Sequence, residues 1–451
     1  MTPATMKDYP DIIGRLFELQ KFGMKFGLDS MRRILDALGR PERDLKLVHV
    51  AGTNGKGSVA AMLREILVGA GYKTGLYTSP HLVTFRERIQ IDRVFVGEEQ
   101  VADLAERVWP ATDPASPPTF FEFVTAMALL HFRDERVDLA VVETGLGGRL
   151  DSTNVVSPLV SAVTNVSLEH TEHLGTTIEA IASEKAGVIK EGVPLVAGRI
   201  SGAALEVLEK QAAKMRVPSF MLLGRDYRAD ILSTDRRGRP TVAYRGPGWS
   251  VKSQPLALAG PYQADNAAAA LALAETLAGL GYRLSPEEAG PALAKVGWPG
   301  RAETFEPGAW PPDHGGLAPL ILDGAHNPAG AEALSRLLAA APRKKLHLVA
   351  GVMADKDIAG VLGPVVALAD QLYLTRPRYR RAADPGVLLE RLTQALGPPQ
   401  CPAGLYPSIP EALRAAALNA GPEDLVVVSG SLFTVGETRA YLTGAPAVES
   451  N

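Results

Sequence analysis

The strongest candidate for chemistry is the glycine-rich segment 52–58, which reads GTNGKGS. It follows an apolar run typical of a buried strand and precedes a segment with the pattern of a helix. Such a turn exposes backbone N–H groups at a helix N-terminus, where an anion is stabilised. Lys56 can reach the outer phosphates of a nucleotide, and the Ser58 hydroxyl can bind Mg²⁺. Although a glycine separates the lysine from the serine, unlike the standard pattern, we favour phosphate binding over a turn that serves only packing.

A second candidate is Glu143, which ends the apolar run Leu139–Val142. In an open parallel sheet, ligands bind beyond the carboxyl ends of the strands. An acidic residue at that edge, in the same domain as a phosphate loop, is well placed to hold Mg²⁺. The alternative is a helix cap or an ion pair with Arg149, and the nearby phosphate loop favours the metal.

A third cluster, Asp323 and His326, follows a strand-like run in the second half of the chain. It again lies at the carboxyl end of a strand and precedes a helix that Asn327 and Pro328 would start. Asn327 is a plausible plain helix cap. Asp323 and His326 are less easily explained as structural residues, so we favour a site there.

Two histidines and one lysine remain undecided on spacing alone. His170 and His173 could face one side of a turn, and a metal site and a hydrogen-bonded structural pair are equally favoured. The acidic residues beside them can simply be solvated. Lys185 lies on a predicted helix, where a lone lysine usually points into solvent and has no special role.

The elements that position these residues alternate between continuous apolar runs and helix-like segments, which predicts an α/β fold with a parallel sheet covered on both faces. The alternation of apolar runs and helix-like segments stops at 229–259 and resumes near residue 319. The segment 229–259 is typical of a small, peripheral antiparallel insertion. The Gly/Pro-rich segment 297–316 precedes the second of these alternating regions and separates it from the first. We predict an N-terminal P-loop-type parallel-sheet ATPase domain over 1–298 and a smaller C-terminal Rossmann-like α/β domain over 299–451.

The apolar patterns predict the position of each main element. The predicted strands are 45–51, 74–77, 139–143, 159–166, 193–197, 320–323, 346–351, 371–374 and 425–429. The predicted helices are 58–71, 120–134, 177–190, 201–215, 265–280, 329–341, 358–369, 385–396 and 409–420.

Composition sets the class of protein. The chain has 451 residues, 46% of them hydrophobic and 22% charged, as in a globular protein of two or three domains. A net charge of −3 gives no basic field for nucleic acid. The single cysteine, Cys401, excludes an internal disulfide, and the most apolar stretch, 267–282, is too short to span a bilayer. Because residues 1–11 also lack the apolar core of a signal peptide, we expect a cytoplasmic protein that binds neither nucleic acid nor a membrane.

Taken in order, the motifs resemble those of the folylpolyglutamate synthase/dihydrofolate synthase family, within the Mur ligase superfamily. They are GTNGKGS at 52–58, TSPHL at 78–82, ERI at 87–89, ETGLGGRLDSTN at 143–154, LEHTEHLG at 168–175, SEKAG at 183–187, Gly300-Arg301 and LDGAHNP at 322–328. The resemblance runs from about residue 20 to Gly436, and only the insertion and the termini carry no family signal.

The resemblance implies metal-binding roles that spacing leaves open. Ser58 and Glu143 would bind one Mg²⁺, and His170, rather than His173, would join Glu143 at a second ion. Lys185 would be carbamylated, which converts a cation into a metal-binding carboxylate and reverses the expectation of a solvated side chain.

The resemblance also implies the substrate-binding residues. The ATP-binding residues would be Thr53, Asn54, Gly55, Lys56, Gly57, Ser58, Asn266, Arg301 and Asp323. The catalytic residues would be Lys56, Lys185, Asp323 and His326, the last two closing over the nucleotide and the incoming glutamate. The folate-side residues would be Ser79, His81, Phe121 and Asp151, of which Asp151 matches a position linked to pterin binding in some members.

The implied activity is the ATP-dependent ligation of L-glutamate to the carboxylate of dihydropteroate or tetrahydrofolate, through an acyl phosphate, by a monomeric enzyme with a hinge in 297–316. It would serve folate biosynthesis and one-carbon metabolism, and we expect a bifunctional enzyme, although the sequence leaves the preferred acceptor open. A peptidoglycan Mur ligase shares this chemistry, but the lysine-glycine-serine order and TSPHL favour the folate branch. A P-loop NTPase that only switches partners is a further alternative, and the cluster at Asp323 argues against it.

Overall fold

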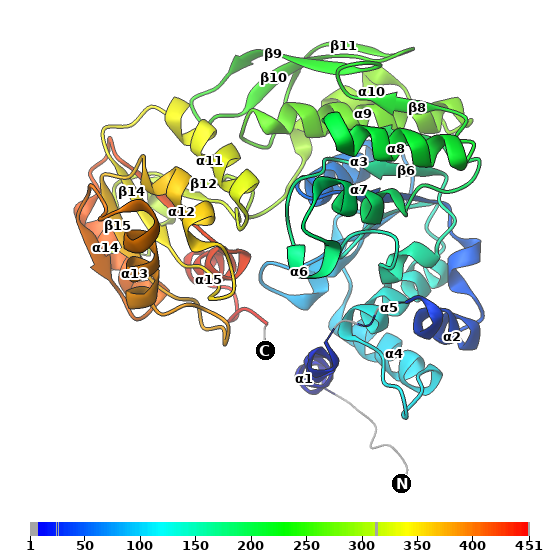
Figure 1. Cartoon of the computed structure of the whole chain (residues 1–451), viewed down its shortest axis with the longest axis horizontal. Helices are drawn as coiled ribbons and strands as arrows, with labels where there is room; N and C mark the ends of the chain where they lie inside the picture. Colours follow the sequence, from blue (N-terminus) through cyan, green and yellow to red (C-terminus); the bar gives the residue numbers. More distant parts are fainter. Residues whose placement is uncertain (1–7, 24, 26, 312–313, 450–451) are drawn as a thin grey trace.

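The computed structural model describes residues 8–23, 25, 27–311 and 314–449. The first seven residues, which carry most of the signal-peptide interpretation, lie outside this range. Figure 1 shows two lobes side by side, the first coloured blue to green and the second yellow to red. Within the described residues, no helix has the length and apolar character needed to cross a membrane.

The first lobe is built on an eight-stranded sheet with the strand order β4-β3-β2-β5-β1-β6-β7-β8. Its two central strands, β1 and β5, are buried at every position, which explains their continuous apolar runs. Most neighbours are parallel, whereas β3 pairs antiparallel with β2 and with β4, so this edge of the sheet is not parallel as expected. The strands are β1 (Leu47–Ala51), β2 (Thr74–Tyr77), β3 (Ile89–Ile91), β4 (Val94–Phe95), β5 (Leu139–Glu143), β6 (Val160–Val163), β7 (Leu195–Ala197) and β8 (Phe220–Leu222).

Helices cover both faces of this sheet. On one face α3 packs against α9 and α10, and on the other α1, α2 and α4 pack around α5. Because α3 is buried along most of its length, the loop at its N-terminus is held in place. The helices are α1 (Tyr9–Glu18), α2 (Asp29–Ala37), α3 (Lys56–Gly69), α4 (Glu98–Val108), α5 (Phe120–Asp134), α6 (Thr171–Leu174), α7 (Ile178–Ala186), α8 (Gly202–Lys214), α9 (Tyr262–Gly279) and α10 (Pro286–Ala292).

The predicted insertion is a three-stranded antiparallel sheet at the outer edge of the first lobe (Figure 1). It consists of β9 (Arg228–Thr234), β10 (Pro240–Arg245) and β11 (Ser250–Pro255). The expectation that it is purely peripheral is wrong in one respect. Val242 and Tyr244 alternate inward along β10 and belong to the main core of the first lobe.

The second lobe has a six-stranded sheet with the order β12-β13-β17-β14-β15-β16. Strand β12 pairs antiparallel with β13 and begins within the Gly/Pro-rich segment, so part of that segment is sheet and not linker. The strands are β12 (Glu303–Phe305), β13 (Leu320–Leu322), β14 (Leu346–Ala350), β15 (Gln371–Leu374), β16 (Ala403–Leu405) and β17 (Leu425–Ser429). The helices are α11 (Pro328–Ala340), α12 (Ile358–Val366), α13 (Pro385–Leu396), α14 (Ile409–Asn419) and α15 (Leu432–Thr443).

Every predicted strand and helix is present, and the largest shift is at α7, which ends at Ala186. The sequence patterns missed several elements, among them the helices α4 and α15, which are as long as some of the predicted ones. The missed elements are α1, α2, α4, α6, α10, α15, β3, β4, β8, β12 and β16.

Among the contacts between the lobes, two involve the loop after β2 and Glu449. Leu82 and Val83, in the loop after β2, are buried in the core of the second lobe. A side chain at Gly436 on α15 would collide with the Leu82 carbonyl, so only glycine allows this approach. Beyond α15 the chain returns toward α1 (Figure 1), and Glu449 bonds to the first lobe. We call Glu449 and its hydrogen bonds to residues 81–85 and Tyr9 the clasp.

Candidate active site

The phosphate loop connects β1 to α3 and is fixed by the end of β6. Asn165 accepts from the Thr53 N–H through its carbonyl (3.0 Å) and from the Asn54 N–H through its side chain (2.9 Å). A side chain at Gly52 would collide with Thr164, and Gly55 has a left-handed φ of 83°. No side chain caps α3, so the N–H groups of its first turn are available to an anion.

Lys56 lies over this loop. Its Nζ donates to the Gly52 carbonyl (3.0 Å) and the Thr53 carbonyl (3.1 Å). Ser58, two residues further, is 3% exposed. The loop therefore presents an ammonium group, backbone donors and a hydroxyl within one turn, an arrangement that suits a phosphate.

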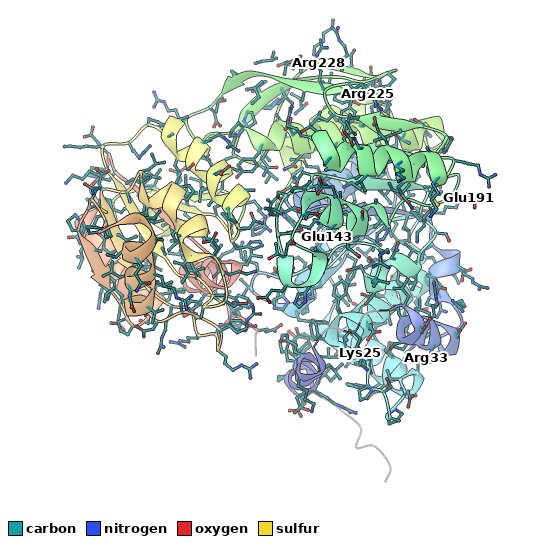
Figure 2. The ribbon with its side chains drawn as sticks, in the orientation of Figure 1. Lys25, Arg33, Glu143, Glu191, Arg225 and Arg228 are labelled. Carbon is teal, nitrogen blue, oxygen red and sulfur yellow. The ribbon has the colours of Figure 1, made fainter. Side chains whose placement is uncertain are left out.

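Glu143 lies at the end of β5, next to the phosphate loop on β1. Figure 2 labels it in the interior of the first lobe, where it is 4% exposed. One oxygen accepts from the Ser79 N–H at 3.2 Å. Burial raises the pKa of this carboxyl to about 7, against the opposing charge of Lys56. Glu143 is thus a buried carboxylate whose remaining lone pairs are open to a cation.

Lys185 is fully buried, so the expectation of a solvated lysine is wrong. Its Nζ forms an ion pair with Glu169 Oε1 at 2.6 Å. Burial lowers the pKa of Lys185 to about 8 despite this partner. Burial acts to raise the pKa of Glu169, but the charges of Lys185 and Lys56 lower it. Sequence reasoning missed Glu169 because no local pattern signals a pair 16 residues apart.

His170 directly precedes α6 and has a left-handed φ of 45°. The residue is exposed, but partial desolvation of its ring lowers its pKa against the charge of Glu169, and the charges of Lys356, Lys56 and Lys185 lower it further. The imidazole is therefore neutral at pH 7, which is the form that binds metals. His173 lies on the exposed turn of α6.

The second lobe presents Asp323 and His326 to the first. Asp323 accepts from the Ala325 N–H (2.9 Å) and the Ala302 N–H (2.8 Å), and burial raises its pKa. His326 Nδ1 lies 2.8 Å from the Gly324 carbonyl, which can only accept, so Nδ1 carries the proton. Burial lowers the pKa of His326 to about 4, and the ring is neutral with an unprotonated Nε2.

The remaining predicted ATP contacts surround the phosphate loop. The side-chain amide oxygen of Asn266 lies 2.5 Å from where a Cβ on Gly55 would be, and the Trp298 ring lies 2.8 Å from the Cβ position of Gly57. Arg301 lies against Gly324, whose Cβ would be 2.7 Å from its guanidinium. The contact of Trp298 with the phosphate loop was not predicted, because no sequence pattern signals it.

The predicted folate-side residues fall into two groups. Ser79 binds Glu143 through its N–H, and Phe121 stacks on Tyr77 with ring centres 5.9 Å apart. Asp151 accepts from Leu146 N–H and from two groups of Thr153, so both its oxygens organise the loop after β5.

Both ring nitrogens of His81 are also hydrogen-bonded within the protein. Its Nδ1 accepts from Arg88 Nε at 2.8 Å, so its Nε2–H donates to the Glu449 carbonyl at 2.7 Å. Burial lowers the pKa of His81 to about 3. His81 and Asp151 therefore position loops through contacts that leave them few atoms for a substrate.

Ser58, Glu143 and His170 fit Mg²⁺ only together with a nucleotide. Within the described ranges, no group of three or more His, Cys, Asp or Glu side chains could hold a metal ion alone. Mg²⁺ typically takes one or two carboxylates, with substrate phosphates and waters as its other ligands. One buried carboxylate and one hydroxyl beside a phosphate loop fit that pattern.

Two protein-family models match the chain, the Mur ligase middle domain over residues 50–274 and the Mur ligase, glutamate ligase domain over 313–432. The dihydrofolate synthase/folylpolyglutamate synthase of Bacillus subtilis is 32% identical over 96% of this chain and 97% of its own length. The corresponding Escherichia coli protein is 31% identical over 96% and 95%. The chain spans about half the length of the halobacterial relatives named "Probable bifunctional folylpolyglutamate synthase/dihydropteroate synthase".

Solved structures of folylpolyglutamate synthases are similar to this chain over nearly its whole length. Folylpolyglutamate synthase from Thermotoga maritima has a TM-score of 0.83 at 35% identity, covering 98% of both chains. E. coli FolC in complex with DHPP and ADP has a TM-score of 0.86 at 29% identity, covering 98% of this chain and 99% of its own. The two family models and the fold place the chain in the Mur ligase superfamily. Within that class, the chain belongs to the folylpolyglutamate synthase/dihydrofolate synthase family.

Proposed function

We propose that this protein uses ATP to ligate L-glutamate to the carboxylate of dihydropteroate or tetrahydrofolate, in folate biosynthesis and one-carbon metabolism. One observation carries the proposal. The phosphate loop, Glu143 and the Lys185–Glu169 pair share the carboxyl edge of the first sheet, and Asn327, directly after His326, bonds to the loop from the second lobe. The names of the relatives, and the DHPP and ADP in the complex of E. coli FolC, support it.

The physical problem of the reaction is to bring two anions together. The acceptor carboxylate must attack the γ-phosphate of ATP, which gives an acyl phosphate and ADP. Lys56 and the N–H groups of α3 offset the charge that develops on the phosphates. Mg²⁺, when bound by Ser58 and Glu143, neutralises phosphate charge, and His170 is the candidate ligand of a second ion. The amino group of glutamate then attacks the acyl carbon and phosphate leaves.

The second lobe supplies the groups near the incoming amine. His326 is neutral and its Nε2 is unprotonated, so it can accept a hydrogen bond from the glutamate ammonium without repelling it. Arg301 and Asp323 would contact the nucleotide. We propose domains at 1–298 and 299–451, and a hinge within 297–316 that closes the lobes and keeps water from the acyl phosphate. Monomeric state and cytoplasmic location stay predictions.

We also propose that Lys185 is carbamylated. A carbamate forms from the neutral amine, and the burial that lowers its pKa to about 8 enlarges the neutral fraction at pH 7 to 8. A carbamate would lie beside the Glu169 carboxylate, and two adjacent anions are stable only with a cation between them. Mg²⁺ would supply that cation.

The test is mass spectrometry of products formed from ATP, Mg²⁺ and L-glutamate, with dihydropteroate and tetrahydrofolate offered separately. One glutamate added to dihydropteroate identifies the biosynthetic step, chain extension on tetrahydrofolate identifies the polyglutamylation step, and both identify a bifunctional enzyme. No addition to either, while ATP binds, contradicts the proposal. It would then favour a ligase of UDP-linked peptides or a nucleotide switch.

A further inference from the structure

Arg88, in the ERI motif, is a buried cation that the proposed mechanism does not use. It is 7% exposed, and its Nε donates to His81 Nδ1 at 2.8 Å. Its guanidinium carbon lies 5.1 Å from the centre of the Phe120 ring. No described residue forms a hydrogen bond or ion pair with its two terminal nitrogens. A buried charge without an anion is strongly unfavourable, so a site that keeps one usually has a partner for it.

Two acids lie near Arg88, and neither forms a hydrogen bond or ion pair with its guanidinium. The Glu87 carboxylate accepts from the backbone N–H groups of Leu82, Val83 and Thr84. Glu143 accepts from the Ser79 N–H and forms no ion pair with Arg88. Neither terminal nitrogen of Arg88 is among the fully enclosed unpaired atoms of the described residues, so both reach accessible space. An anion from outside the protein can therefore meet them.

Strand order places Arg88 relative to the reaction centre. The Arg88 carbonyl accepts from the Thr78 N–H at 3.0 Å, next to the end of β2. Along this edge β3 is followed by β2, then β5 with Glu143, then β1 with the phosphate loop. At the spacing of neighbouring strands, the Arg88 backbone lies roughly 10 Å from the end of β5 and roughly 15 Å from that of β1. Arg88 thus lies on the opposite side of Glu143 from the phosphate loop, beside the predicted folate-side residue His81.

We propose that Arg88 binds the non-reacting carboxylate of the terminal glutamate of a folate acceptor. A guanidinium holds a carboxylate through two parallel N–H donors, and the Phe120 ring beneath it fixes the plane of that fork. The assignment rests on the proposed function. A folate acceptor carries two carboxylates on its terminal glutamate, one that reacts and one that does not, whereas dihydropteroate carries only the reacting one. Arg88 is then a specificity residue that serves the folate acceptor alone.

The test compares the two acceptors in Arg88→Gln and Arg88→Lys. We expect KM for tetrahydrofolate to rise about 10- to 100-fold, as for a lost charged hydrogen-bond pair, and KM for dihydropteroate and ATP to change less than about threefold. Arg88→Lys keeps the charge and most of the packing, so it separates the fork geometry from a folding defect. Arg86→Gln is the matched control, because Arg86 is paired with the exposed Glu98.

A binding experiment tests the role of Arg88 without the need for catalytic turnover. Calorimetry would compare tetrahydrofolate with an analogue whose non-reacting carboxylate is a carboxamide. The unmodified protein should bind the amide about 10- to 100-fold more weakly, and Arg88→Gln should bind both equally. Equal rises of KM for both acceptors, equal binding of acid and amide by the unmodified protein, or no tetrahydrofolate binding would each overturn the assignment. Failure of glutamate ligation with a retained acid–amide difference would contradict only the proposed function.

Discussion

The side-chain amides of Asn54 and Asn327 form a reciprocal pair across 273 positions of the chain. Nδ2 of Asn54 donates to Oδ1 of Asn327 at 3.3 Å, and Nδ2 of Asn327 donates back at 3.0 Å. Asn327 also caps α11 by accepting from the Gly330 N–H, as the sequence predicted. The phosphate loop of one lobe is therefore bonded to a helix start of the other, directly after His326.

Asn54→Ala removes this pair and leaves the cap of α11, whereas Asn327→Ala removes both. We expect Asn327→Ala to be less stable than Asn54→Ala by about 1 kcal/mol, the typical cost of a lost cap. The double variant should be no less stable than Asn327→Ala, because the pair is lost only once. Urea unfolding of the three variants measures this, and strictly additive losses would contradict the pair.

Lys56→Met should lower kcat about 10²- to 10³-fold, because the ammonium is a charge placed at the phosphates. Its bonds to the Gly52 and Thr53 carbonyls lie within the loop, so the fold should survive. Steady-state kinetics with saturating ATP measure the loss. Lys210→Ala, an exposed lysine on α8, is the control and should retain full activity.

Glu143→Gln should stabilise the metal-free protein. The carboxyl ionises near pH 4.5 when unfolded and near 7 when folded, so the folded state binds more protons between these values and stability falls as pH rises. The shift corresponds to about 3 kcal/mol at pH 8, which the neutral amide would recover. Chemical denaturation at pH 8 and at pH 4.5 measures it. An equal effect at both values, or none, would show that burial of the charge is not the cause.

Lys185 should become carbamylated in ¹³C-bicarbonate, with a carbamate NMR signal that grows from pH 7 to pH 9 because the pKa of the amine is about 8. Addition of Mg²⁺ should increase the signal, since the Glu169 carboxylate lies beside it. Lys185→Arg keeps a cation for Glu169 and should give no such signal and no activity. A signal unchanged in that variant would come from another amine.

Glu449→Gln should weaken the clasp. The carboxylate accepts from Tyr9 Oη (3.0 Å), Thr84 Oγ1 (3.1 Å) and the Phe85 N–H (2.6 Å), and a neutral amide is a poorer acceptor. We expect a loss of about 1–3 kcal/mol of stability. Thermal unfolding would be compared with that of Glu106→Gln on the exposed side of α4, which should match the unmodified protein.

The parts of this protein that depend on local pattern were predictable. Continuous apolar runs identify the central strands, and the glycines, lysine and serine of 52–58 identify the phosphate loop. Helix α15 was not predictable from local pattern, because the residues it buries include Thr434, Gly436 and Thr438, which form no apolar stripe.

The pairings within the site were not predictable for a different reason. Lys185 with Glu169 and His81 with Glu449 meet only because strand crossovers bring distant positions together. A resemblance to a family assigned roles to Lys185 and His81, but it did not supply their partners. Arg88 shows the same limit, since nothing in the ERI motif signals burial without an anion.

The burial of Leu82 and Val83 in the second lobe also bears on how the molecule is made. These residues belong to the loop whose Ser79 N–H bonds Glu143, and their packing partners on β17 and α15 are synthesised more than 300 residues later. A nascent chain can complete the first sheet and its phosphate loop well before then. The loop after β2 lacks these partners until α15 and Glu449 have been synthesised, so the contacts that hold this loop form last.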